Sequence, residues 1–335
     1  MSARCAPERE SSPKPAQSPR VVPLWKKALP YIGTLLIFAL IFWRIPIRQV
    51  LAALGNVPIL SFVGVFMPFS VFYWLVDSYC LTWVIRRFNA PLSYADIIPI
   101  RASMYLLSLI NTNLGQGGVA YYIHRKAHIP FLELLSSILF IALLEVYQLF
   151  LFSTLGVIFY SPTGGAQVEI VRILRVAYII AWAALFGFMA FFAAARGRES
   201  IRSGIVNSRV GGIAGTFMAA RPIDYLAVLA IKAPSFLGSV VAQYFALSLF
   251  GIAIPFVKLI LFLPLVFLAA ALPIAVAHLG TSQAAWVLFF SGNAPEPAIL
   301  AYSLAAHFTF MFCNGVIGLF FLRRASRELT AIRAE

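Results

Sequence analysis

The chain has 335 residues, of which 61% are hydrophobic and only 11% charged, with a mean hydropathy of +0.89. Soluble domains carry about 25% charged residues, so this composition excludes an ordinary soluble protein. The net charge is +14, but the basic residues cluster at the ends of apolar segments, which indicates cytoplasmic loops rather than a nucleic-acid surface. We therefore expect an all-α polytopic membrane protein that has no nucleic-acid partner.

Residues 1–24 are polar and rich in Pro, Ser and Arg, which predicts a disordered cytoplasmic tail without the apolar core of a signal peptide. A transmembrane domain is expected over 25–325, followed by a short cytoplasmic tail at 326–335. Crossing the hydrocarbon core takes about 20 apolar residues. Six segments meet that length and are predicted to be full spans: 28–47, 58–85, 131–160, 172–195, 222–251 and 297–322.

Two further apolar segments, 98–123 and 257–293, are interrupted by Gly, Pro and Asn. Basic residues favour the cytoplasmic side, which places both termini, Arg87 and Arg125 there. The first segment then begins and ends in the cytoplasm, and its roughly 26 residues are too few to cross about 30 Å twice. It is predicted to be a re-entrant or broken helical hairpin. The same reasoning makes 257–293 a second hairpin that enters from the outside.

The two interrupted segments can also be aligned, since LGQGGVAYY at 114–122 lies over LGTSQAAWV at 279–287 without a gap. Because their predicted membrane orientations are opposite, the alignment predicts an inverted-topology repeat. In transporters of that architecture, discontinuous helices from both halves meet near the middle of the membrane and build the substrate site.

The stretch NTNLGQGG at 111–118 leaves two interpretations open. Non-helical backbone inside a bilayer is tolerated only where it is buried in protein or lines a cavity. Either the polar side chains satisfy a broken helix, or a half-helix restarts near Gly118 and its first amides attract an anion such as a lipid phosphate. The candidate headgroup-binding residues around this break are Arg101, Asn111, Asn113, Gly115, Gly117, Gly118 and Arg125.

Glu145 lies in the middle of segment 131–160, where an ionised side chain costs on the order of 3 kcal/mol unless it is paired. It is expected to face the protein interior and either form a salt bridge or carry a titratable proton, with Arg101 and Arg125 as candidate cations. Asp77 is placed similarly within its own segment. Lys232 lies close to a basic loop and is expected to extend its ammonium toward the cytoplasm.

The second break adds His278, Gly280, Ser282 and Gln283 as candidate headgroup-binding residues, with hydrogen-bonded packing as the alternative role for His278. The three cysteines lie far apart in the sequence, and neither a Walker loop nor an H-E-x-x-H motif occurs. We therefore expect no metal site, no cofactor and no enzymatic activity in this chain.

Arg101 with NTNLGQGG, the basic Arg125 and the mid-span Glu145 resemble the first motif block of the transmembrane region of lysylphosphatidylglycerol synthases. The stretch LPIAVAHLGTSQAAWVLF at 272–289 is similar to the second block of that family. The resemblance covers about residues 30–322. It implies lipid translocation, or lipid handling linked to envelope assembly, whereas the synthase activity belongs to a separate soluble domain.

Family members often carry Gly-Glu, Glu-Arg and Arg-Glu where this chain has Gly117-Gly118, Glu145-Val146 and Ser282-Gln283. Because several charged positions are neutral here, the substrate of the family cannot be carried over. We expect a lipid flippase-like transporter of the plasma (inner) membrane that translocates or binds an anionic or phosphate-containing lipid. Two alternatives stay open: an accessory subunit or enzyme of lipid or glycolipid modification that works with an envelope-biosynthesis enzyme, and a scaffold.

Overall fold

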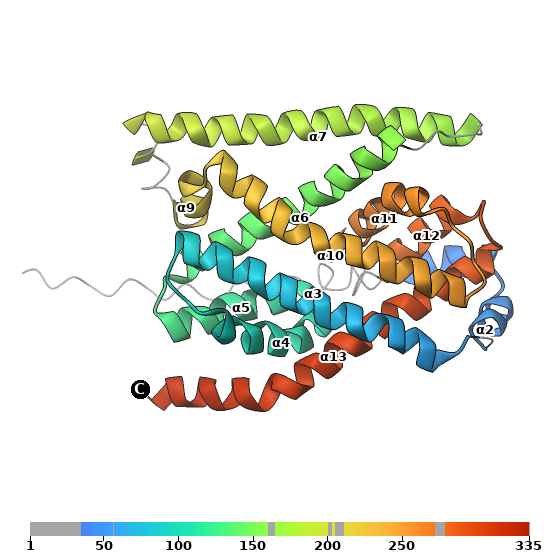
Figure 1. Cartoon of the computed structure of the whole chain (residues 1–335), viewed down its shortest axis with the longest axis horizontal. Helices are drawn as coiled ribbons and strands as arrows, with labels where there is room; N and C mark the ends of the chain where they lie inside the picture. Colours follow the sequence, from blue (N-terminus) through green and yellow to red (C-terminus); the bar gives the residue numbers. More distant parts are fainter. Residues whose placement is uncertain are drawn as a thin grey trace, which may run out of the picture.

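The computed structural model describes residues 35–55, 57–159, 165–199, 203–204, 211–271 and 279–334. Every regular element in that part of the chain is a helix, as the composition predicts. The predicted tail at 1–24 lies outside the described residues. The helices in chain order are α2 (Ile47–Gly55), α3 (Ile59–Phe88), α4 (Tyr94–Ile110), α5 (Thr112–Ala127), α6 (Phe131–Phe159), α7 (Gly165–Gly197), α9 (Gly211–Ala219), α10 (Pro222–Leu249), α11 (Phe256–Ala271), α12 (Thr281–Phe290) and α13 (Glu296–Ala334) (Figure 1).

Five of the described helices are long and apolar enough to cross a membrane. They are α3, α6, α10, the Val171–Gly197 part of α7 and the Glu296–Ala325 part of α13. Each coincides within a few residues with one of the six predicted spans, because an uninterrupted apolar run of this length forms a helix in lipid. The chain is therefore an integral membrane protein. Helix α13 continues to Ala334, so the described part of the predicted tail at 326–335 is helical.

The sixth predicted span, 28–47, is not one straight helix in its described part. The helix Leu35–Arg44 meets α2 at an angle of 87°. Pro46 stands between the two helices, and proline lacks a backbone N–H and disfavours a helical residue before it. The chain therefore turns sharply where the sequence pattern alone suggests continuation.

Each of the two interrupted segments contains a pair of helices that pack against each other, and we call each pair a hairpin. Helices α4 and α5 are separated by Asn111 alone, and they pack antiparallel, with Gly115 against Ser108 and Gly118 against Met104. Helices α11 and α12 also pack against each other, with residues 272–278 between them outside the described part. The two hairpins lie toward opposite ends of the long helices (Figure 1). Their re-entrant placement in the membrane and the inverted repeat stay predictions.

The end of the bundle that carries the α4–α5 hairpin is rich in basic residues and is held by ion pairs. Arg87 at the end of α3 donates from Nε to Oδ1 of Asp224 in α10 at 2.9 Å. Lys126 of α5 contacts Oδ1 of Asp96 in α4 at 2.9 Å. The hydroxyl of Ser93 and then the ammonium of Lys126 lower the pKa of Asp96, because both interact with the ionised carboxylate. These contacts join the end of α3 to the start of α10, and the end of α5 to the start of α4.

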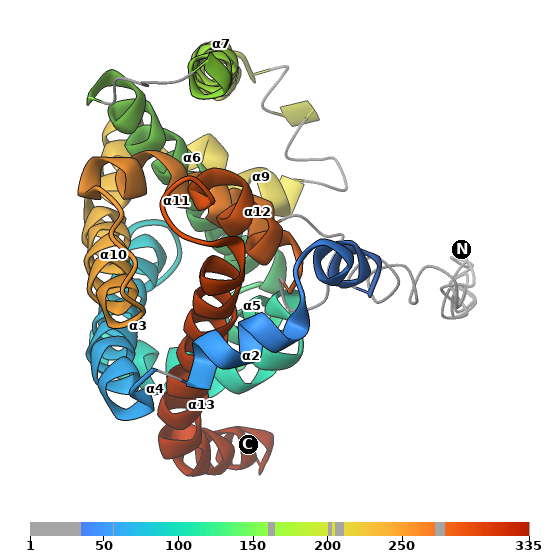
Figure 2. The ribbon, with the colours of Figure 1, turned by 90° about the vertical axis from the view of Figure 1, so that its right-hand side faces the viewer.

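Helix α7 lies at the edge of the bundle, packed against α6 and α9 (Figures 1 and 2). Most of its apolar side chains face outward: Ile179 is 70% exposed and Ile180 is 64% exposed. In an integral membrane protein such a surface contacts lipid, so α7 leaves the interior of the bundle to the other helices.

The packing of α6 on α11 depends on a glycine. A Cβ atom added at Gly156 would lie 2.5 Å from the Cα of Leu261, and Ser153 one turn earlier donates a 2.7 Å hydrogen bond to the carbonyl of Leu261. Two backbones approach this closely only where one of them has no side chain.

We predict that Gly156→Ala lowers the free energy of unfolding by about 1–3 kcal/mol, because the added methyl group must push α11 away from α6. The measurement is denaturation in mixed micelles. Gly187→Ala in α7 is the matched control, since its Cβ would meet no atom within 4 Å. A Gly156→Ala protein as stable as Gly187→Ala would contradict this description of the α6–α11 contact.

Candidate functional site

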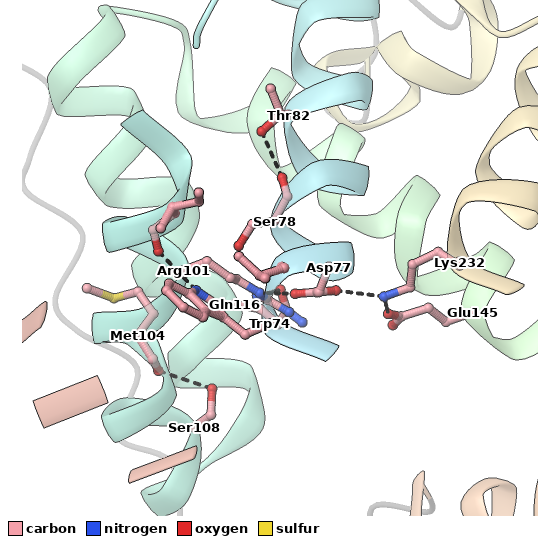
Figure 3. Close-up of polar contacts among 12 residues, drawn as sticks. Trp74, Asp77, Ser78, Thr82, Arg101, Met104, Ser108, Gln116, Glu145 and Lys232 are labelled. Carbon is pink, nitrogen blue, oxygen red and sulfur yellow. Dashed lines mark hydrogen bonds and ion pairs between the residues drawn. The ribbon is translucent and has the colours of Figure 1, made fainter. Parts of the chain in front are cut away.

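Four charged side chains from four helices meet inside the bundle (Figure 3). Lys232 of α10 donates from Nζ to Oδ1 of Asp77 in α3 at 2.6 Å and forms a second ion pair with Glu145 of α6. Arg101 of α4 donates from Nε to the other oxygen of Asp77. The side chains of Lys232 and Asp77 are 3% and 4% exposed. We call these four residues the ionic cluster; two cations and two anions make it neutral.

The ionic cluster extends to a fifth helix. Arg101 also donates from Nη1 to Oε1 of Gln116 in α5 at 3.2 Å, which joins the two arms of the hairpin, while its contact with Asp77 links the hairpin to α3 (Figure 3). Trp74 of α3 donates from its indole to the carbonyl of Ile98 at 3.1 Å on the same hairpin. Burying a charge without a partner costs several kcal/mol, so the cluster is stable only while all its members are in place. It therefore determines how α3, α4, α5, α6 and α10 lie relative to one another.

Two expectations about these charges are wrong. The cation that pairs with Glu145 comes from α10, a helix to which neither of the candidates Arg101 and Arg125 belongs. Lys232 does not extend toward the cytoplasm but lies buried between two carboxylates. The physical reason is that two anions within reach compensate an ammonium in the interior, which removes the advantage of reaching water.

A cavity of about 430 Å³ opens beside the ionic cluster. Residues from α3, α4, α6, α10, α11, α12 and α13 line it, and Glu145 and Lys232 form part of its wall. The side chain of Glu145 is 34% exposed, so its carboxylate is the accessible charged group there. The polar side chains on the wall also include Tyr73, Tyr105, Ser108, Gln148, Ser235, Ser239, Gln243, Ser282, Ser303, His307 and Asn314.

The first break supplies a cap and a close helix contact. Helix α5 restarts at Thr112, not near Gly118, and the side chain of Asn111 accepts a 3.3 Å hydrogen bond from the amide of Leu114. A Cβ at Gly115 would lie 1.9 Å from Oγ of Ser108, and one at Gly118 would lie 2.6 Å from Sδ of Met104. These two glycines thus allow α5 to pack closely on α4. The arrangement favours the interpretation in which the residues of NTNLGQGG satisfy and pack a broken helix, over the one in which they bind an anion.

The other candidates of this break lie elsewhere. Gly117 lies within α5 with no atom within 4 Å of an added Cβ, and Arg125 lies in the last turn of α5, at the basic end of the bundle. The side chain of Asn113 lies outside the described residues.

At the second break, Gly280 is the N-cap of α12 with φ = +93°, a value that favours glycine. Its amide donates a 2.6 Å hydrogen bond to Oε1 of Gln283, which closes the start of the helix. His278 lies outside the described residues. Ser282 lines the cavity, and so do Ser108 and Leu109 at the end of α4. The two breaks therefore border one cavity, although Asn111 and the glycines of the first break are not on its wall.

Sequence reasoning missed most of the cavity wall on α10. Lys232, Ser235, Ser239 and Gln243 are spaced by three or four residues and so share one face of this helix. A polar stripe at that spacing on an apolar helix is a signal that the sequence contains, and it could have identified this wall. Ser303, His307 and Asn314 of α13 also line the cavity, and their four- and seven-residue spacing places them on one face of that helix, which is a signal of the same kind.

The sequence matches the model of a protein family described as the lysylphosphatidylglycerol synthase TM region, over residues 28–318. No curated protein matches the chain.

We predict that Lys232→Met lowers the free energy of unfolding by about 3 kcal/mol or more, because Glu145 is left without its cation inside the bundle. The double variant Lys232→Met/Glu145→Gln should recover part of this loss, since Asp77 retains Arg101 and no carboxylate is then unpaired. Denaturation in mixed micelles measures both.

Arg44→Met is the control, because the Arg44 side chain is 74% exposed in its pair with Glu296 and its loss should change stability by less than about 1 kcal/mol. A double variant less stable than Lys232→Met alone would contradict the assignment of Lys232 as the partner of Glu145.

Proposed function

Because the chain belongs to the family of the lysylphosphatidylglycerol synthase TM region, we propose that it translocates a lipid between the two leaflets of the membrane. The observation that carries the proposal is the cavity, whose largely apolar wall contains a cluster of charged and polar side chains. It is enclosed by α3, α6, α10 and α13, helices long enough to span the bilayer. Polar and ionisable groups at membrane depth are costly, and their clustering around a cavity is typical of a pathway for a polar group. The headgroup would pass through this cavity while the acyl chains stay in the surrounding lipid.

The two hairpins supply the movable parts of this proposal. The end of α4 and the start of α12 border the cavity from different hairpins, and the hairpins lie toward opposite ends of the bundle (Figure 1). Movement of one hairpin would open the cavity to one leaflet, and movement of the other would open it to the opposite leaflet. Movement of the α4–α5 hairpin would have to break the contact between Arg101 and Asp77. Lys232 would meanwhile keep α3, α6 and α10 together as the static frame, and Glu145 on the wall would bind a proton or a polar group of the lipid during transfer.

The phosphate of the expected anionic lipid would find basic residues at the end of the bundle that carries the α4–α5 hairpin rather than inside the cavity. His124, Arg125 and Lys126 occupy the last turn of α5, where cations also complement the helix dipole. We propose that the summed positive charge of this end attracts anionic lipid headgroups at the membrane surface, although Lys126 also pairs with Asp96. This end and both termini would then lie in the cytoplasm, with the protein in the plasma (inner) membrane. We propose no catalytic role, since both carboxylates of the ionic cluster pair with Lys232.

The test is leaflet exchange of labelled lipids in vesicles that contain the purified protein. We predict faster lipid exchange than in protein-free vesicles. The rate of exchange should fall by about fivefold or more in Ala306→Phe, because the phenyl ring occupies cavity space that the headgroup needs, and overpacking that space costs about 1–3 kcal/mol.

Ala183→Phe on the exposed face of α7 is the matched control and should exchange lipids like the unmodified protein. Melting curves of both variants identify any loss of folding. The proposal fails if no lipid exchanges faster with protein, or if properly folded Ala306→Phe is as active as Ala183→Phe.

A further inference from the structure

The charges on the cavity wall leave no net charge for a ligand. Among the described residues that line the cavity, the carboxylate of Glu145 and the ammonium of Lys232 are an ion pair. Lys232 also pairs with Asp77, which in turn pairs with Arg101. A phosphate inside the cavity would meet the exposed carboxylate of Glu145 rather than a cation, and like charges at close range are unfavourable. An ammonium group would have to draw Glu145 away from Lys232, which would then lose one of its two anions.

Three buried polar atoms on the wall have no hydrogen-bond partner within the described part of the chain. They are the hydroxyl of Tyr105, the hydroxyl of Ser235 and the amide oxygen of Asn314. Their residues are 6%, 5% and 9% exposed, so each atom lies in the interior. An unpaired buried polar group is unfavourable by about 1–3 kcal/mol. The residues that carry these three atoms line one cavity, on α4, α10 and α13, and a rotation of each side chain toward the cavity would let a ligand supply the missing hydrogen bond.

The chemistry of these groups specifies the ligand. Ser235, Ser239 and Gln243 follow one another along the polar face of α10, and Asn314 adds an acceptor from α13. Hydroxyl and amide groups both donate and accept, and the ligand groups that match such a wall without adding charge are hydroxyls. A wall that forms hydrogen bonds with a hydroxylated ligand rejects analogues that lack the hydroxyls, since its own polar groups then stay unpaired.

Aromatic side chains complete the cavity. Tyr73, Trp286 and Phe310 line it, and the rings of Tyr73 and Phe310 lie 5.8 Å apart at 79°. The C–H face of a sugar or cyclic polyol packs against such rings while its hydroxyls point to the polar face. The volume of about 430 Å³ lies within the range of about 300–1,000 Å³ that is typical of small-ligand sites.

We infer that the cavity binds a neutral, hydroxyl-rich headgroup, a sugar or polyol, through Tyr105, Ser235, Ser239, Gln243 and Asn314. The inference rests on the proposed function for its assumption that this headgroup belongs to a lipid. A free sugar has the same chemistry, so the experiment must distinguish the two sources.

The experiment compares, in vesicles with protein, the leaflet exchange of lipids with identical acyl chains and different headgroups: hexosyl diacylglycerol, phosphatidylglycerol and phosphatidylethanolamine. Uptake of free radiolabelled glucose is measured in parallel. We expect hexosyl diacylglycerol to exchange about fivefold or more faster than the other two lipids, because a rate ratio of about five corresponds to the net free energy of roughly one hydrogen bond. We expect no uptake of glucose. Equal exchange of all three lipids, or preference for phosphatidylglycerol, overturns the inference and leaves lipid translocation standing. Glucose uptake without lipid exchange contradicts the claim that the bound sugar is the headgroup of a lipid.

A binding measurement separates this inference from the proposed function. The fluorescence of Trp286 on the wall should change on titration of detergent-solubilised protein with hexosyl diacylglycerol and not with phosphatidylglycerol; Trp286→Phe identifies its share of the signal. Selective binding without leaflet exchange supports the inference and contradicts translocation. Equal binding of both lipids contradicts the inference.

Asn314→Leu and Ser235→Ala test the residues. Each should bring the exchange of hexosyl diacylglycerol down by about fivefold, because one hydrogen bond to the headgroup is lost. Ser235→Ala should not melt at a lower temperature, since it removes a polar atom that has no partner in the described protein. A melting curve of Asn314→Leu identifies any loss of folding. Ser248→Ala, at the exposed end of α10, is the control and should keep the preference. Unchanged selectivity in both folded cavity variants overturns the assignment.

Discussion

The burial of one ammonium group between two carboxylates is the constraint on which the rest of the structure depends. Lys232 lies in an apolar helix, 3% exposed, and contacts Asp77 and Glu145 from two other helices. Arg101 balances the remaining charge and reaches Gln116. A buried ion pair contributes little to stability compared with apolar residues of the same volume, but removing one partner is costly. The ionic cluster therefore acts mainly by specifying one arrangement of five helices.

The same constraint decides the chemistry of the cavity. Because the cations of the cluster are paired with its carboxylates, the wall offers hydroxyl and amide groups rather than a charged cradle. Basic residues lie instead at the end of the bundle, in the last turns of α3 and α5. An amphiphile with both a phosphate and a hydroxylated group would find a separate place for each, with the phosphate at the surface and the hydroxyls inside. This division is consistent with a family tied to lipid handling.

How far the sequence predicts the fold depends on the range of the interactions. Five spans follow from local composition, and the break at Asn111 follows from residues that destabilise a helix in lipid. The bend between Leu35–Arg44 and α2 is not predicted, although Pro46 signals it. The length of the apolar run at 28–47 favours one continuous span, and a single proline does not change that prediction.

The roles of individual polar residues were harder to predict. The partner of Glu145 lies on α10, and a pairing between distant helices is invisible in the spacing of either. The sequence left open whether Gly115 and Gly118 belong to an anion site or to a satisfied helix break, because their close contacts with the neighbouring helix α4 are not visible in the sequence. The polar stripe on α10 could have been recognised, since its members recur every three or four residues. Only the tertiary structure shows that Asn314 and Tyr105 border the same cavity.

The most direct test of headgroup binding in the cavity is photo-crosslinking. A hexosyl diacylglycerol with a diazirine on its sugar is irradiated with the protein in vesicles, and the labelled peptides are identified by mass spectrometry. We predict labels on residues 232–243 of α10 and 303–314 of α13, which line the cavity, and competition by unlabelled hexosyl diacylglycerol. Labels confined to the exposed face of α7, without competition, would contradict the account.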